Sequence, residues 1–255
     1  MAKMKDIYEE LASLNKVQDH INSIEDDDLK NALLYALNTN PILHFGSEQI
    51  PLFYELDFDE DSKEEIERLT KGADAFIIFS QHMSELKNEL PQTPSQLILK
   101  MNYAYAVTLM ETCLADMLKH AVLSQKIFMI NALEKIKHFQ SVKVDLIEIY
   151  KNPDYVSRFV MKVLTEYLYH NIALVLDIYR FTLNEDYPEF IMNNKGELIK
   201  IAEIRHDIVH RNGFDKEGNE HTFTLEGVRK AMQDIMDFVQ GMHIYIAEAE
   251  KNLPF

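Results

Sequence analysis

The chain has 255 residues, 47% of them hydrophobic, which is enough to build a substantial core and argues against intrinsic disorder. Its 26 lysines and arginines stand against 42 aspartates and glutamates, and the formal net charge of −16 disfavours general binding to nucleic-acid backbones and anionic membranes. The single cysteine, Cys113, excludes an intrachain disulfide and a cysteine-based metal cluster.

Glycine and proline are scarce, at seven each, and helix-forming residues are frequent, which predicts an all-α fold. Apolar residues at three- and four-residue steps predict two helices between Ile7 and Leu37, while residues 41–61 show no clear periodicity. A further helix is expected over 73–90. The prolines at 91 and 94 then mark the best candidate domain boundary.

The predicted organisation is an N-terminal helical region, 1–92, followed by a helical domain, 95–255. The pattern in the second part predicts six helices: 95 to about 123, 127–139, 142–150, 154 to about 183, 197–211, and 224 to about 249. The N-terminus lacks an apolar signal core, and no stretch approaches the roughly 20 apolar residues of a membrane span. We therefore expect a cytoplasmic protein without membrane contact.

Residues 205–213, Arg-His-Asp-Ile-Val-His-Arg-Asn-Gly, concentrate polar side chains around two apolar ones. Unpaired charges are costly in a core, so these groups must be solvated, ion-paired or part of a site. A simple helix end would account for Gly213 in a left-handed conformation and for an Asp207–Arg211 pair. It leaves Arg205 and His206 without a role.

A metal site is a second interpretation, because Glu203, His206 and His210 fall close to one helical face. The spacing is unspecific, and metallohydrolase helices usually carry the glutamate between the two histidines, which this segment lacks. The remaining histidines are scattered without ligand spacing and receive no site role: His20, His44, His82, His120, His138, His170, His221 and His243. We expect no metal and no cofactor.

A third interpretation comes from a family resemblance. Arg205, the polar His206 directly after it, and His210 four residues further on resemble the Arg-x4–6-His motif of the HEPN superfamily, and residues 208–213 resemble the way such proteins leave the motif. A long upstream helix with Glu111 among apolar positions is similar to the early HEPN helix. The resemblance covers about 95–249 and implies a HEPN-type helical bundle with an additional N-terminal helical region.

The resemblance also implies a metal-independent endoribonuclease with Arg205, His206 and His210 as catalytic residues. Metal-free RNA cleavage needs a base for the 2′-hydroxyl, positive charge near the phosphate, and an acid for the leaving oxygen. Histidine titrates near neutrality and arginine binds phosphate through a planar fork, so both residue types suit these tasks. Glu111, if it paired with the motif helix, would support it as in the family.

Positions 205 and 210 lie about 140° apart on an ideal helix, so one helix does not aim both at one phosphate. The family's solution is a homodimer whose two motifs line one cleft, and we expect the same here. RNA would be the substrate, an antitoxin or regulatory protein a further partner, and toxin, stress or anti-phage systems the setting. The alternative is a non-catalytic HEPN-like interaction or dimerisation module.

Overall fold

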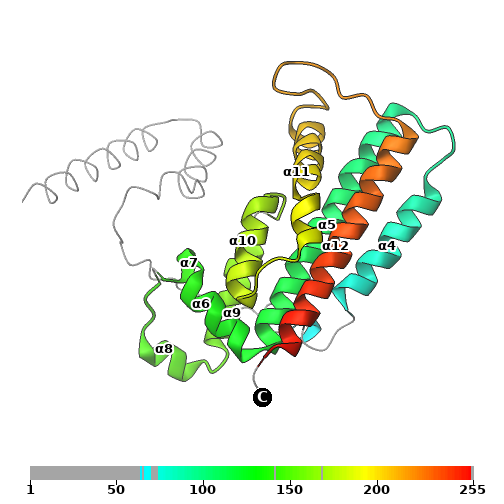
Figure 1. Cartoon of the computed structure of the whole chain (residues 1–255). Helices are drawn as coiled ribbons and strands as arrows, with labels where there is room; N and C mark the ends of the chain where they lie inside the picture. Colours follow the sequence, from blue (N-terminus) through cyan, green and yellow to red (C-terminus); the bar gives the residue numbers. More distant parts are fainter. Residues whose placement is uncertain (1–63, 65, 70–73, 141, 168, 254–255) are drawn as a thin grey trace, which may run out of the picture. The chain divides into compact units, whose positions relative to one another are not determined.

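The computed structural model describes residues 64, 66–69, 74–140, 142–167 and 169–253 (Figure 1). By compactness the chain divides into Met1–Leu52 and Phe53–Phe255, so all described residues belong to the second unit. The helices expected between Ile7 and Leu37 lie outside the described residues.

Within the described part, every regular element is an α-helix, which confirms the all-α class. The elements are α4 Ala75–Glu89, α5 Gln96–Ser124, α6 Lys126–Lys135, α7 Lys137–Gln140, α8 Leu146–Lys151, α9 Tyr155–Glu166, α10 Ile172–Leu183, α11 Glu189–His210 and α12 Leu225–Lys251. None of these helices has the length and apolar character needed to cross a membrane.

The long helix α5 is the centre of the bundle, and α4, α11 and α12 pack along it (Figure 1). Its buried residues include Leu99, Val107, Met110, Leu114 and Leu118, which recur at three-, four- and eight-residue steps and so line the same side of the helix. The predicted boundary at Pro91–Pro94 falls between α4 and α5, two helices that pack against each other in one compact unit.

A second group of helices, α6, α9 and α10, covers another side of α5. The fully buried Tyr179 of α10 donates a hydrogen bond from its hydroxyl to the carbonyl oxygen of Leu114 on α5, 2.6 Å away. Since buried polar groups are costly when unpaired, this bond fixes α10 against the central helix.

The sequence predicted one helix over 154–183, but the structure has two helices there, α9 and α10. The chain leaves the helical path between α9 and α10, where the side chain of Asn171 accepts a hydrogen bond from the backbone N–H of Leu174 and caps α10. Tyr169 in the turn donates its hydroxyl to the carbonyl oxygen of Leu164. The side chains of this turn thus compete successfully with helix continuation.

Helix α11 begins at Glu189, directly after Pro188, and therefore starts earlier than the expected residue 197. Its interior holds Gly196, a weak helix former whose neighbourhood is open, and burial of residues such as Ile191 outweighs the local propensity. In place of the helix predicted over 142–150, the structure has the shorter α8. The helix predicted over 127–139 is interrupted at Ile136 and forms two helices, α6 and α7.

The end of α11 agrees with the sequence interpretation. Asn212 and Gly213 both have positive φ angles, 56° and 86°, and the N–H of Gly213 returns to the carbonyl oxygen of Asp207 at 2.8 Å. The side chain of Thr224 caps α12 by accepting from the N–H of Gly227. A loop over 211–224 therefore connects the polar end of α11 to the start of α12.

Candidate functional site

The side chain of Arg205 points from α11 towards Glu111 in the middle of α5. Nη2 of Arg205 lies 3.6 Å from Oε2 of Glu111, and the side chains are only 18% and 16% exposed. Burial raises the pKa of Glu111, and the charge of Arg205 opposes that rise. Arg205 therefore forms a half-buried ion pair between two helices and is not a free cation on the surface.

This pair is incompletely satisfied. Nε of Arg205 and Oε1 of Glu111 are both buried without a hydrogen-bond partner in the described structure. Such groups are rare in folded proteins because each costs desolvation energy without a compensating bond. Buried ion pairs retained at such a cost are often tied to function rather than to stability.

His206 and His210 lie one turn apart on α11, with ring centroids separated by 4.6 Å and ring planes tilted by 44°. His206 is half-buried and His210 is exposed. Burial lowers the pKa of His206, and the nearby His210 and Arg211 lower it further. His206 is therefore held as a neutral imidazole at neutral pH, the form that accepts a proton.

His170 joins this group from a distant part of the sequence. It lies in the turn before α10, a helix that packs against α11, and it interacts electrostatically with Arg205, His206 and His210. Burial lowers the pKa of His170, followed by the charges of Arg205 and His210. No spacing rule in the sequence pointed to His170, because the helix break that places it there depends on local caps.

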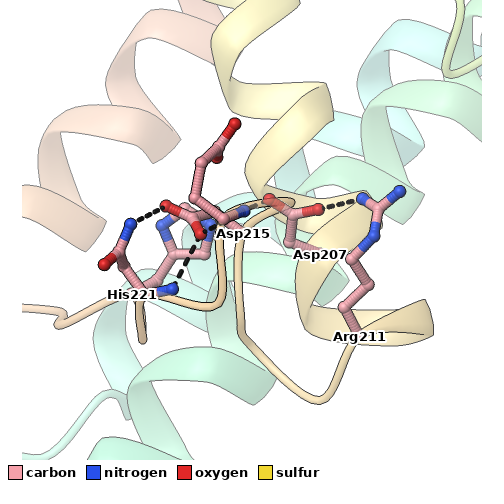
Figure 2. A network of polar contacts seen from close by, with 6 residues as sticks. Asp207, Arg211, Asp215 and His221 are labelled. Carbon is pink, nitrogen blue, oxygen red and sulfur yellow. Dashed lines mark hydrogen bonds and ion pairs between the residues drawn. The ribbon is translucent and has the colours of Figure 1, made fainter.

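Asp207 organises the other side of the helix end (Figure 2). Its buried carboxylate accepts hydrogen bonds from the guanidinium of Arg211 and from Nε2 of His221, the latter at 2.9 Å. The hydrogen bond from His221 is the main reason that the pKa of Asp207 is lowered, with a further contribution from Arg211. The expected Asp207–Arg211 pair is confirmed, and His221 is an additional partner.

The loop that follows is fixed by short-range contacts. The backbone N–H of His221 bonds the carbonyl oxygen of Gly213 at 2.9 Å, and Lys100 of α5 pairs with Glu220 at 2.9 Å. Asp215 accepts from the backbone N–H groups of Glu217 and Asn219 and closes the loop tip, as Figure 2 shows in part. The polar segment is thereby held against α5.

The predicted site residues Arg205, His206 and His210 therefore lie together on the last two turns of α11. Arg205 and Arg211 each face a carboxylate, Glu111 and Asp207 respectively. The groups left for proton transfer are the histidines. The arrangement combines His206 and His170, whose pKa values are lowered, with a buried positive charge, and this combination suits general acid–base chemistry beside an anion.

The alternative metal set receives no support from the geometry. In the part of the chain that the structure describes, no cluster of three or more histidine, cysteine, aspartate or glutamate side chains is arranged to hold a metal ion. Glu203, His206 and His210 thus share a helix without forming a ligand set.

Comparison of the chain with protein-family models, with curated proteins and with solved structures finds no match in any of the three.

Proposed function

We propose that the chain is a metal-independent endoribonuclease of HEPN type that acts as a homodimer. The proposal rests on the motif resemblance and on one observation above all: His206 and His210 are adjacent, and His170 interacts electrostatically with both of them and with Arg205. In a chain of net charge −16, this is a local concentration of groups suited to a phosphodiester.

In the proposed reaction, a neutral histidine removes the proton of a ribose 2′-hydroxyl. The 2′-oxygen attacks the adjacent phosphorus and forms a cyclic phosphate, while the bond from phosphorus to the 5′-oxygen breaks. A protonated histidine gives its proton to that oxygen. His206 suits the base because its pKa is lowered, and His210 is the exposed candidate for the acid.

Arg205 has a different role in this scheme from the one expected from sequence. Its guanidinium is held by Glu111 and is only 18% exposed on its side chain, so it supplies a fixed positive potential more than a free fork. A fixed charge costs no reorganisation when negative charge develops on the phosphate oxygens. The second copy of the motif would supply the remaining donors.

The test is cleavage of structured RNA and transfer RNA in EDTA by the wild type and the Arg205→Ala and His210→Ala variants. Loss of an acid or base lowers rates by about 100-fold or more, and we expect His210→Ala to lose at least that. The controls are His82→Ala and Arg180→Ala, since both residues are exposed and lie outside the site. Equal cleavage by all five proteins would contradict the proposal.

The pH profile gives a second check. Because the pKa of His206 is lowered, its neutral form persists below the ordinary histidine value of about 6.5. The acid limb of the cleavage rate is therefore expected below that pH. A limb above pH 7 would exclude His206 as the base.

A non-catalytic HEPN-like interaction module is the second candidate, and one surface feature favours it. Leu97, Met101 and Tyr105 are spaced four residues apart on one face of α5 and are 67%, 62% and 49% exposed. Exposed apolar patches mark interaction surfaces. A chain that never cleaves RNA, yet loses self-association in a Met101→Lys variant measured by sedimentation, would support this candidate over the nuclease.

A further inference from the structure

A pocket lies on the flank of α11 that faces α12, apart from the histidine group. It has a volume of about 260 Å³, and its wall includes Tyr103 of α5, Ile201 of α11 and Phe223 of the loop. Drug-sized ligands occupy pockets of about 300–1,000 Å³, so this one suits a smaller molecule. Its apolar wall would hold a short hydrocarbon portion.

Tyr103 is the unusual residue in this wall. It is only 5% exposed, yet its hydroxyl makes no hydrogen bond within the described part of the chain. By contrast, the hydroxyls of the buried Tyr169, Tyr179 and Tyr245 each donate to a backbone carbonyl oxygen. The Tyr103 hydroxyl is not among the fully buried atoms that lack a partner, so it is open to the pocket and available to a ligand.

The electrostatics of the pocket favour a cation. Glu197 and Asp234 lie on its wall, and after burial they are the groups that raise the pKa of Tyr103, so both carboxylates act on the hydroxyl. Their present partners, Lys200 and Lys230, are 68% and 71% exposed. Exposed ion pairs are weak, so an incoming cation can displace them.

The number of acceptors also fits a particular group. A primary ammonium has three N–H donors, and Tyr103, Glu197 and Asp234 are acceptors on the wall that can each take one of them. Thr222, Thr224 and His221 add further polar groups to the same wall. Lys230 is also on the wall, but it already pairs with Asp234, so a phosphate or carboxylate would meet a lining with two negative charges and one positive charge. The first turn of α12, which borders the pocket, does not reverse this balance. The net charge of −16 further attracts cations to the molecule.

We infer that this pocket is a binding site for a small primary amine, with the ammonium at Tyr103, Glu197 and Asp234 and a short apolar portion against Ile201 and Phe223. The inference does not depend on the nuclease proposal, because none of these residues belongs to the group formed by His170, His206 and His210. His221 also lies on the pocket wall and bonds Asp207, so a ligand would contact the same loop that follows the motif.

The experiment is calorimetric titration of the full chain with butylammonium, and with butyrate and 1-butanol as probes of matched size. We expect butylammonium to bind and the other two to bind at least tenfold more weakly. Tyr103→Phe and Glu197→Gln should each weaken butylammonium binding by about tenfold, the loss for one hydrogen bond to a charged group. The matched control is Glu248→Gln, an exposed carboxylate of α12 outside the pocket.

Lys230→Met should increase the affinity for butylammonium, whereas misfolding of a variant would only reduce it. Because Lys230 pairs with Asp234, its removal frees an acceptor, and butylammonium should bind several-fold more tightly. Tighter binding of butyrate would identify an anion site instead, and equal binding of butanol would identify a merely apolar cavity. No binding of butylammonium, or an equal loss in Glu248→Gln, would overturn the inference.

Discussion

The Asp207 network offers the sharpest test of how the end of α11 is held. In an Asp207→Asn variant the volume is kept, but the negative charge that accepts from Arg211 and His221 is lost. Hydrogen bonds to charged groups contribute about 1.5–3 kcal/mol each. Arg211 and His221 are 35% and 25% exposed on their side chains, so solvent weakens both contacts. We expect the free energy of unfolding to fall by about 2 kcal/mol in total.

The measurement is urea unfolding of the full chain at pH 7, followed by circular dichroism. The control is Asp237→Asn, which changes an exposed carboxylate of α12 that accepts a hydrogen bond from Gln233 one turn away. We expect less than about 0.5 kcal/mol for the control. The reasoning would be refuted if Asp207→Asn were no more destabilising than Asp237→Asn.

The effect has a defined pH dependence. The pKa of Asp207 is lowered in the folded chain, by the hydrogen bond from His221 first and by Arg211 second. The stabilisation from a carboxylate with a lowered pKa is present above its unfolded pKa of about 3.9 and is lost as the pH falls through the folded value. The difference between wild type and Asp207→Asn should therefore shrink below about pH 4. A difference that grew in acid would contradict the assigned charge state.

Three further outcomes follow from other contacts. Glu111→Ala should lower the free energy of unfolding, measured in urea, by about 2–4 kcal/mol, because it leaves the guanidinium of Arg205 half-buried without its partner. A double variant that also carries Arg205→Ala should recover part of that loss. If the nuclease proposal holds, His170→Ala should reduce RNA cleavage by about tenfold or more while leaving the urea midpoint within error, and unchanged cleavage would place His170 outside the site. Gly213→Ala and Gly218→Ala both add a Cβ at a φ of 86°, so both should lose about 1 kcal/mol of stability to backbone strain. Only the Cβ at position 213 would meet Lys100, whose Nζ would lie 2.8 Å away. A greater loss in Gly213→Ala than in Gly218→Ala would therefore measure that contact.

The proposed chemistry has an electrostatic consequence for RNA affinity. Arg205 and Arg211 both face carboxylates, so each contributes less net charge than a free arginine would. With a total of −16, the chain has no general attraction for RNA backbones. Binding by one copy should therefore be weak, and the proposed dimer would be needed to bring two histidine groups to one substrate.

Local sequence determined where most of the long helices lie. Ser95 and Thr224 cap α5 and α12, and Asn212 with Gly213 ends α11, as their residue types predict. These features depend on backbone groups within a few residues, so no distant contact is needed to specify them. The all-α class follows from the same local information, summed along the chain.

The composition of the candidate site was decided by tertiary structure. Arg205 and His210 are near in sequence, but Glu111, His170 and His221 reach the end of α11 from α5, from the turn before α10 and from the loop before α12. Their approach depends on which faces the helices bury, and a face buries against whatever partner best covers its apolar residues. The pocket beside α12 has the same origin, because its walls belong to segments far apart in the chain. Spacing along one helix therefore predicted which residues share a turn and the pair of Asp207 with Arg211, whereas packing between helices decided which charges from other elements they meet.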